Sequence, residues 1–319
     1  MFLNIKARNA ILLAAFSYCI LGSSAVFAGK SNKHESVVYC GFENFSVQKT
    51  INKVKHNRKV TIFIVGTCNE RFTIEKDNIS LSGNADGDGS IDGGITEIRV
   101  IGGRRINIEY LDISGAGNGV LVSDGATANI TNNDIHNNQL DGIGVFNNSF
   151  VRVEFNSITG NGRPDPFFEA GINAGVGSTV RSRGNYIAYN GYAAVEIANQ
   201  SYFRSGLFTS GAINPADKDI ILQKGCSGGE LAGTCGVPGT NAIECFKGGI
   251  CDLRNTDVTG STLISSMSTF DVRTSTINGS VDGSGGSLIR LRGSVTGSGS
   301  VNCSSEAIGQ GVLCGGLIP

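Results

Sequence analysis

The middle of the chain contains charged side chains whose types suit acid–base chemistry. The candidate catalytic residues are Arg163, Asp165, Glu169 and Glu196, with His136 and Asp141 one repeat earlier. Two carboxyl groups about 5 to 10 Å apart can act as acid and base in glycosidic-bond hydrolysis. An arginine or histidine can neutralise a sugar carboxylate, or take the adjacent proton in an elimination or epimerisation. The alternative interpretation is an ordinary solvated face of charged residues.

Nearby residues could bind the substrate of such a site. The candidate substrate-binding residues are Phe167, Phe168, Asn173 and Tyr192. Aromatic rings offer flat apolar faces on which a sugar ring can stack, and an asparagine amide both donates and accepts hydrogen bonds. The alternative is that the two phenylalanines fill a gap beside a loop.

The segment NADGDGSID, residues 84–92, places oxygen ligands at alternate positions. Asn84, Asp86 and Asp88 match the first half of a calcium loop. The bidentate glutamate expected at the twelfth position is missing, because Ile95 stands there. Calcium is therefore the one cofactor that the sequence suggests. A solvated acidic turn is the alternative.

A short pattern that comes round four times between residues 106 and 199 must position these side chains. Its isoleucines, Ile113, Ile135, Ile158 and Ile187, recur at intervals of 22, 23 and 29 residues. Within each copy, apolar residues alternate over very short runs, which indicates β-strands and not helices. Each copy is predicted to be one coil of a parallel β-helix, because stacked coils can share a core that one coil cannot form alone.

Asparagines occupy equivalent places in three copies, as Asn133, Asn156 and Asn185, with Leu111 in the first copy. Asparagine tolerates the left-handed backbone region that a sharp corner requires, and its amide can bond to the asparagine of the next coil. We interpret this column as structural and not as a ligand site.

Alternation along the first strand of each coil predicts which side chains face outward. If Ile143, Ile172 and Val195 face the core, their neighbours face solvent. The outer column then contains Leu121, Gly144, Asn173 and Glu196. The third copy is about six residues longer, and its extra segment RPDPFFEA comes immediately before this strand. Because insertions in a solenoid map to loops, which often carry function, the site is predicted here.

The start of the solenoid carries a family resemblance. The segments TINKVKH, GTCNERF, TIEKDNISLSGN and SIDGG resemble the start of pectin-lyase-like right-handed β-helix proteins. The repeats resemble those of periplasmic carbohydrate-binding proteins and sugar hydrolases, including the NosD and alginate-epimerase groups. The resemblance covers roughly residues 45–205 and implies a right-handed coil, a frequent association with polysaccharides, and a cleft over the first-strand sheet. The GHG, QDTL, DFIFG and DPH motifs of the standard enzymes are missing from the sequence, so no particular reaction is implied.

Residues 1–28 are predicted to be a signal peptide. Lys6 and Arg8 precede an apolar run that ends near Leu21, and Val26-Phe27-Ala28 offers small residues for cleavage. That run is too short for a convincing membrane span, so we expect a secreted or periplasmic protein without membrane insertion. Cleavage leaves 24 basic and 27 acidic residues. The resulting net charge of about −3 argues against nucleic acid as a partner.

Cysteine usage agrees with export. Eight cysteines follow residue 28, and six of them fall in close pairs. Disulfides are favoured over a thiolate metal site, because the spacings are long and the three histidines are dispersed. Eight cysteines allow 105 pairings, so pairing between neighbours is a preference. The predicted bonds are Cys40–Cys68, Cys226–Cys235, Cys245–Cys251 and Cys303–Cys314.

The predicted organisation is a signal peptide (1–28), an N-terminal arm (29–44) and a single all-β domain (45–319). Within that domain we expect a cap and first coils (45–95), regular repeats (96–208), a disulfide-stapled loop elaboration (209–250) and narrower C-terminal coils (251–319). The cap should include a short amphipathic helix over residues 48–57 that covers the open end of the first coil.

The predicted function is that of an exported polysaccharide-directed protein, which binds a polysaccharide or cell-surface glycan on the first-strand sheet. A lyase, an epimerase and a glycoside hydrolase all stay open as its reaction. The alternative is a non-catalytic, adhesin-like structural solenoid.

Overall fold

The computed structural model describes residues 34–41, 46–55, 58–84, 87, 93–115, 117–162, 169–206, 219–222, 241–304, 308–310, 315 and 317–318. The segment Lys33–Pro319 forms one compact unit. Its described residues form 28 strands and one helix. The predicted all-β, right-handed parallel β-helix is confirmed.

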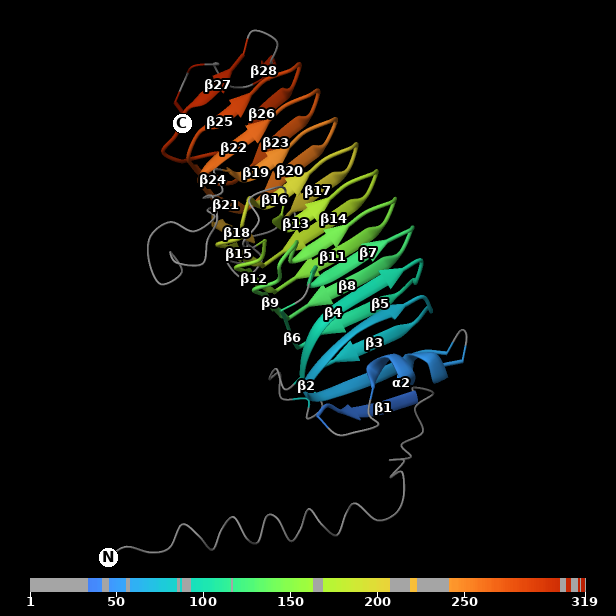
Figure 1. Ribbon diagram of the computed structural model, residues 1–319. Helices are drawn as coiled ribbons and strands as arrows, with labels where there is room; N and C mark the ends of the chain where they lie inside the picture. Colours follow the sequence, from blue (N-terminus) through green and yellow to red (C-terminus); the bar gives the residue numbers. More distant parts are fainter. Residues whose placement is uncertain are drawn as a thin grey trace, which may run out of the picture. The chain divides into compact units, whose positions relative to one another are not determined.

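Each regular coil contributes three strands, and strands at the same place in successive coils pair in parallel (Figure 1). The first-strand sheet contains the last part of β2 (Val60–Ile74) and β4 (Gly93–Ile101), then β7 (Val120–Ser123), β10 (Ile143–Val145), β13 (Ala170–Ala174), β16 (Ala193–Ile197), β19 (Asn241–Cys245), β22 (Ser261–Ile264), β25 (Val281–Gly283) and β27 (Val301–Cys303).

The second-strand sheet contains β1 (His34–Tyr39), the first part of β2, β3 (Ile79–Ser82), β5 (Ile106–Glu109), β8 (Thr127–Thr131), β11 (Phe150–Glu154), β14 (Thr179–Arg183), β17 (Tyr202–Ser205), β20 (Ile250–Arg254), β23 (Thr269–Arg273), β26 (Leu288–Arg292) and β28 (Ile308–Gln310). The third-strand sheet contains β6 (Leu111–Ser114), β9 (Asp134–His136), β12 (Ser157–Thr159), β15 (Tyr186–Ala188), β18 (Asp219–Leu222), β21 (Thr256–Thr259) and β24 (Thr276–Asn278).

The core is built from the inward half of each alternating strand. The four repeated isoleucines, Ile113, Ile135, Ile158 and Ile187, stack in register on the third-strand sheet, and each is fully buried. Outward neighbours are more exposed, which gives strands such as β8 an alternating burial pattern. Such a stack removes the apolar face of every coil from water, and this burial is the main stabilising contribution to the fold.

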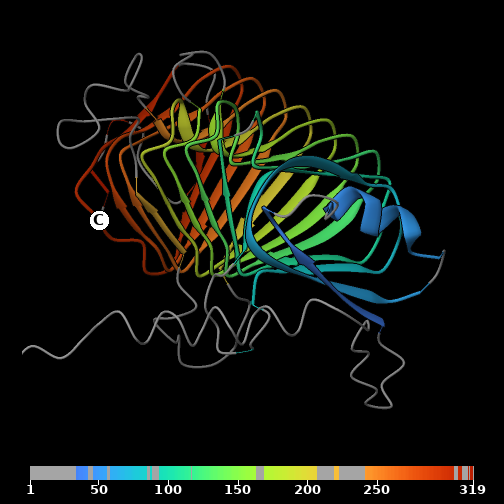
Figure 2. The same ribbon diagram turned by 60° about the horizontal axis from the view of Figure 1, so that its bottom comes forward.

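The amino-terminal end of the stack is covered by helix α2 (Val47–Lys53), as Figure 2 shows. Val47 and Ile51 are its buried residues. The helix is shorter than the predicted 48–57, because Val54 adopts an extended backbone and Lys76 Nζ bonds to the carbonyls of Ile51, Asn52 and Val54. The lysine thereby satisfies the helix C-terminus, where a cation is favourable.

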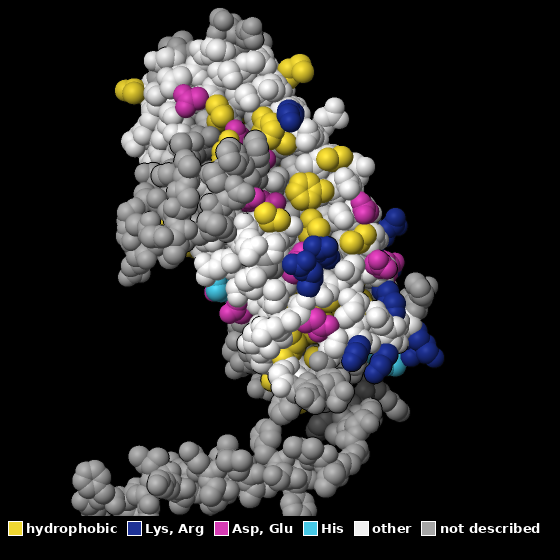
Figure 3. Space-filling model, in the orientation of Figure 1, with side chains coloured by type: hydrophobic (Ala, Val, Ile, Leu, Met, Phe, Trp, Pro, Cys, Tyr) yellow, Lys and Arg dark blue, Asp and Glu magenta, His cyan; other side chains and the backbone are white. Residues whose placement is uncertain are grey.

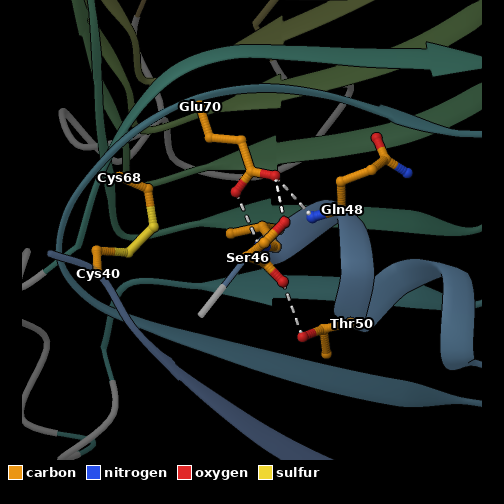
Figure 4. Close-up of a disulfide and its surroundings, with 7 residues drawn as sticks. Cys40, Ser46, Gln48, Thr50, Cys68 and Glu70 are labelled. Carbon is orange, nitrogen blue, oxygen red and sulfur yellow. Dashed lines mark hydrogen bonds between the residues drawn. A yellow bond between two sulfur atoms is a disulfide. The ribbon is translucent and has the colours of Figure 1, made fainter. Parts of the chain in front are cut away.

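Glu70 of β2 fixes the other end of α2 (Figure 4). Its carboxylate accepts hydrogen bonds from the backbone N–H groups of Val47 (2.9 Å) and Gln48 (3.2 Å), and from the Ser46 hydroxyl (2.6 Å). A negative charge at a helix N-terminus satisfies N–H groups that have no partner within the helix. The same view shows the Cys40–Cys68 disulfide, which confirms that predicted bond and ties β1 to β2.

Strand pairing extends into two regions that the predicted organisation set apart from the regular coils. The N-terminal arm, 29–44, includes strand β1, which pairs with β2 over six residues and belongs to the solenoid. The region 209–250 does not lose the repeat altogether, because β18 pairs with β15 and β19 pairs with β16. A coil therefore runs through this region, and its repeat is hidden in the sequence by the long segments that separate its strands. Cys226 and Cys235 lie outside the described residues.

The C-terminal coils are shorter than the central ones. Successive second strands there start at Ile250, Thr269 and Leu288, which are 19 residues apart. In this part of the solenoid, Cys303 is disulfide-bonded. Its predicted partner, Cys314, lies outside the described residues. In the described part of the chain, no helix is long and apolar enough to cross a membrane.

The predicted Cys245–Cys251 disulfide is not formed in the structure. Both residues are buried thiols, and their side chains hydrogen-bond to one another. Burial raises the pKa of the Cys251 thiol, and the neighbouring Cys245 raises it further. The sequence distance suggested a staple, but these cysteines lie on two different strands, β19 and β20, and serve as core residues.

The predicted asparagine column is confirmed as a structural ladder. The Nδ2 of Asn133 donates to Oδ1 of Asn156 (3.0 Å), and Asn156 donates in the same way to Asn185 (3.0 Å). The reason given for asparagine was partly wrong, because the left-handed residue is the one before each rung, as in Asn132 (φ 55°) and Phe155 (φ 57°). Asparagine is needed for its amide, which also donates to a carbonyl of the preceding coil.

A second asparagine ladder lies five residues further along each coil. Asn138, Asn161 and Asn190 are buried and bond to one another at 2.8 and 3.0 Å. Each again follows a left-handed residue, for example Asn137 (φ 53°). Two corners of each central coil are therefore held by buried amides that are both donors and acceptors.

Candidate functional site

The predicted outer column on the first-strand sheet is present in the structure. Ile143, Ile172 and Val195 face the core and are fully buried. Their neighbours pair in register across the coils, and the column extends beyond the predicted residues in both directions. It contains Thr73, Arg99, Leu121, Gly144, Asn173, Glu196, Glu244, Leu263, Asp282 and Asn302.

Glu196 and Glu244 form a pair of carboxyl groups at the centre of this column. They occupy paired positions on β16 and β19, strands whose backbones lie about 4.8 Å apart. Glu196 is 4% exposed and Glu244 is 8% exposed. The Oε2 atom of each has no hydrogen-bond partner among the described residues. Buried carboxyl oxygens without a donor are rare in folded proteins, and they mark this pair as a candidate site.

The environment favours the protonated form of Glu196. Burial raises its pKa to about 8, and the negative charges of Asp141, Glu244 and Glu169 add to the shift, while Lys247 opposes it. Burial also raises the pKa of Glu244, and a hydrogen bond from Tyr192 partly offsets this shift. At neutral pH, Glu196 is therefore mainly an acid that can donate a proton, next to a carboxyl group stabilised by a phenol.

Tyr192 is oriented by Glu244 rather than left open for a sugar. Burial raises the pKa of Tyr192, and so do the hydrogen bond to Glu244 and the negative charges of Glu244 and Glu196. The phenol is thus protonated at any ordinary pH and acts as a donor. The structure brings the predicted Tyr192 to the site, but its hydroxyl contacts a carboxyl group.

Asp141 lies beside the pair and has partners of its own. Its Oδ1 accepts a hydrogen bond from the backbone N–H of Ala170 (2.8 Å), and its side chain is also bonded to Asn173. Burial raises its pKa to about 7, the two hydrogen bonds lower it, and Glu169 raises it. Asp141 therefore joins two coils and orients Asn173. Its position suits it to holding the site in place rather than to direct chemistry.

Not all of the predicted residues meet at this site. Asp141, Glu169, Asn173, Tyr192 and Glu196 lie close enough to interact electrostatically or by hydrogen bonds. His136 does not join them, because it lies on β9 of the third-strand sheet, where its Nε2 is 3.1 Å from Asp112 Oδ1. Arg163, Asp165, Phe167 and Phe168 lie outside the described residues, and their roles stay predictions.

The calcium prediction also stays a prediction. Asn84 follows β3, but Asp86 and Asp88 lie outside the described residues. Within the described ranges, no group of three or more metal-ligating side chains is found.

Sequence reasoning missed two residues of the site, Glu244 and Phe146. Glu244 stands in AIEC, which repeats the AVEI pattern around Glu196, but the long interval between them concealed the match. The Phe146 ring lies over Gly144 and Gly175, and a β-carbon on Gly144 would lie 2.8 Å from its edge. The ring is half-buried next to the Asp141–Asn173 position. The glycine between Ile143 and Val145 was the available signal.

A second acid on the same sheet, Glu97, has its charge compensated by neighbouring arginines. It is fully buried, accepts a hydrogen bond from Arg99 Nε at 2.7 Å, and has Arg71 Nε 2.5 Å from its other oxygen. Two arginines therefore compensate one carboxylate, whereas Glu196 and Glu244 face each other.

Charged side chains are sparse on the face seen in Figure 3, where polar atoms and backbone predominate and basic residues gather over the amino-terminal coils.

Comparison with known proteins agrees with the observed fold. Residues 93–210 match the family model for the right-handed beta helix region. The chain is similar to a crystal structure of pectate lyase Pel9A, with a TM-score of 0.57 and 13% identity over 88% of this chain and 79% of that one. It is also similar to alginate lyase from Paenibacillus sp. str. FPU-7, with a TM-score of 0.55 and 14% identity over 87% and 99% of the two chains. No curated protein matches the sequence.

Proposed function

We propose that the protein is exported and acts on a polysaccharide at the outer face of the first-strand sheet, by hydrolysis of a glycosidic bond. The observation that carries this proposal is the Glu196–Glu244 pair, two buried carboxyl groups in register with an oxygen on each that lacks a hydrogen-bond partner. The similarity to two structures named as lyases of pectate and of alginate supports a polysaccharide as the ligand.

We propose hydrolysis with retention, because Glu196 and Glu244 occupy paired positions on neighbouring strands. Retaining glycosidases use two carboxyl groups that lie closer together than those of inverting enzymes. In this scheme the Glu244 carboxylate attacks the anomeric carbon while Glu196 donates its proton to the leaving oxygen. Water then attacks the glycosyl–enzyme ester as Glu196 removes its proton, which releases the sugar and restores both carboxyl groups.

Neighbouring residues have supporting roles in this scheme. The Tyr192 hydrogen bond favours the ionised form of Glu244. The Phe146 ring offers an apolar face for a sugar, and Asn173, oriented by Asp141, offers amide groups for its hydroxyls. Because Glu196 and Glu244 are almost completely buried, the sugar must displace the side chains that cover them.

The charge of the site favours a neutral glycan. The negative charges of Asp141, Glu169 and Glu244 all raise the pKa of Glu196. Among the described residues, Lys247 is the one cation whose charge acts on Glu196. A uronate would bring a further negative charge into this environment, whereas a neutral sugar would not.

The test begins with a glycan array on the protein lacking residues 1–28, followed by assays of each bound glycan. Release of reducing ends indicates hydrolysis, and absorbance of an unsaturated product indicates a lyase. We expect reducing ends, and a loss of at least about a hundredfold in rate for Glu196→Gln and for Glu244→Gln. Glu35→Gln, on exposed β1, is the matched control.

Each contrary result is informative. Binding without any product would overturn hydrolysis and favour the non-catalytic, adhesin-like solenoid. Unsaturated products would favour a lyase. A protein that binds no glycan at all would overturn the polysaccharide proposal. Export is tested separately, by sequencing the amino terminus of the protein recovered outside the cytoplasm, where cleavage after Ala28 is expected.

A further inference from the structure

The second-strand sheet carries an outer column whose charge changes along the solenoid. Its residues pair in register from coil to coil, as Asn107, Asn129, Arg152, Arg181, Arg204, Asp252, Asp271 and Arg290. The column is thus neutral in the early coils, basic in the middle coils and mainly acidic in the later coils. This face is distinct from the one that holds Glu196 and Glu244.

Both ends of the column are satisfied by their neighbours. The Asn129 amide donates to Asn107 at 2.9 Å, and Asn107 donates to Ser80 at 3.0 Å. In the later coils, Asp252 pairs with Arg254 at 2.7 Å, and Asp271 pairs with Arg273 at 3.2 Å and with Arg292 at 3.0 Å. Each acid of the later coils is therefore paired with at least one arginine.

The middle of the column differs. Arg152 and Arg181 are exposed and directly adjacent in register, and no carboxylate of the described residues forms an ion pair with either. Like charges at paired positions repel each other, so the fold gains nothing from this arrangement. Arg183 adds a fourth basic residue beside Arg204, and Glu154 is the one acid among them.

These residues enclose a hollow that is open to solvent. A cavity of about 330 Å³ is lined by Arg152, Glu154, Arg181, Ser182, Arg183, Arg204 and Gly206. Aromatic rings orient two of its arginines, since Arg181 lies 5.3 Å from the centre of the Phe150 ring and Arg183 lies 5.1 Å from that of Phe155. A guanidinium packed on a ring keeps its donor edge available to an anion.

The spacing identifies the shape of the ligand. Three arginines follow one another at one-coil intervals, about 4.8 Å apart, along the axis of the solenoid. A linear polymer with evenly repeated oxyanions can place one anion at Arg152 and the next at Arg181, and the planar donor fork pairs with an oxyanion in a bidentate manner. Arg204, which lies in register with Asp252, extends the basic column by one coil. The net negative charge expected for the mature protein argues against nucleic acid.

We propose that the outer face of the second-strand sheet binds an acidic polysaccharide along the arginine column Arg152, Arg181 and Arg204. The polymer carries carboxylate or sulfate groups, whose shared oxyanion chemistry the arginines recognise. This site holds a polymer and does no chemistry on it. It is independent of the proposed hydrolytic site on the first-strand sheet.

The experiment measures the affinity of the protein for polygalacturonate, dextran sulfate and neutral dextran by calorimetric titration at low and moderate salt. We expect binding to one or both acidic polymers, weakening as salt rises, and none to neutral dextran. Arg181→Gln should weaken binding about tenfold, and Arg152→Gln with Arg181→Gln about a hundredfold. Preference between the two polymers identifies the oxyanion.

Two controls separate this proposal from others. Arg290→Gln removes the same charge from the same sheet two coils beyond Asp252 and should change affinity less than about twofold. Glu196→Gln should leave the affinity unchanged, so failure of the hydrolytic proposal does not affect this one. Thermal unfolding of each variant confirms folding, since the substituted arginines are on the outer face.

Unchanged affinity of the double variant would overturn the proposal. Equal binding of neutral dextran, or binding of duplex DNA more tightly than either acidic polymer, would overturn it as well.

Discussion

The asparagine columns and the charged columns both stack identical or like-charged side chains in register, but only the asparagines hydrogen-bond to one another. At each corner, an asparagine in one coil meets an asparagine in the next, and the pair is joined by hydrogen bonds of 2.8 to 3.0 Å. On the outer faces, Glu196 meets Glu244 and Arg152 meets Arg181 at the same kind of paired position. The Oε2 atom of each glutamate lacks a partner among the described residues, and no described carboxylate forms an ion pair with either arginine.

The difference follows from the chemistry of the side chains. An amide both donates and accepts, so a column of identical amides satisfies itself however many coils it spans. An ionised carboxylate only accepts and a guanidinium only donates, so two ionised carboxylates, or two guanidiniums, cannot bond to each other. A repeat of one charge is therefore not a device for holding coils together, and its partner must come from outside the column. Both outer columns are therefore the surfaces at which we propose binding.

The largest expected effect comes from breaking an asparagine ladder. Asn156→Ala removes the amide that donates to Ile130 and Glu154 carbonyls, and it leaves Asn133 without its acceptor. We expect the free energy of unfolding to fall by about 3 kcal/mol or more, because several buried groups lose their partners. Denaturant unfolding measures it. Asn129→Ala, on the outer amide column, should cost less than about 1 kcal/mol. Equal costs would contradict the distinction between the two positions.

The next effect is a loss of stability as pH rises. The folded state raises the pKa of Glu196 to about 8 and that of Asp141 to about 7, above their ordinary values of 4.5 and 3.8. Their protonated forms are favoured by folding, so the stabilisation is complete below the ordinary values and is lost as pH rises toward the folded ones. Each group should remove up to about 1.4 kcal/mol per pH unit within its window. Chemical unfolding at pH 4 to 9 checks this, and a curve that rises across pH 5 to 8 would contradict it.

A smaller effect separates a balanced carboxylate from an unbalanced one. Glu97→Gln leaves Arg71 and Arg99 without their buried partner, and should destabilise the fold by about 1 to 2 kcal/mol after allowance for the partial exposure of both arginines. Melting temperature and denaturant unfolding both report it. A neutral or stabilising outcome for Glu97→Gln would show that ion pairing does not distinguish the two acids.

The smallest effect is expected at the cap. Glu70→Ala removes the acceptor of the Val47 and Gln48 N–H groups and should cost about 1 kcal/mol. Hydrogen exchange of those two amides should accelerate while the central coils keep their protection. If the amides of the central coils also lose protection, helix α2 stabilises the whole solenoid and not only its amino-terminal end.

Much of the fold was predictable because coil repetition leaves a direct trace in sequence. The four isoleucines and three asparagines recur at coil intervals. Each set stacks at one place in successive coils, the isoleucines on the third-strand sheet and the asparagines at one corner. The outer column followed from alternation alone, so Asn173 and Glu196 were placed correctly. The Cys40–Cys68 bond was found because both residues flank the capping helix.

The rest could not be read in this way, because it depends on contacts between distant segments. The AIEC strand with Glu244 is far from its partner in sequence, and the repeat that relates them is interrupted. His136 was grouped with the acids because it is close to Asp141 in sequence. It lies on β9 of the third-strand sheet, whereas the acids lie on or beside the first-strand sheet. Cys245 and Cys251 show the same limit, since residues close in sequence can be core neighbours without being bonded.

The most direct test of the central claim is the free energy of unfolding of Glu196→Gln at pH 8.5, measured beside the wild type. If Glu196 is a binding residue that the fold holds at a cost, replacing its charge with an amide should stabilise the protein by about 1 kcal/mol or more, because repulsion from Glu244 and the burial of a charge are both relieved. If the variant is less stable than the wild type, Glu196 belongs to the scaffold and the account is contradicted.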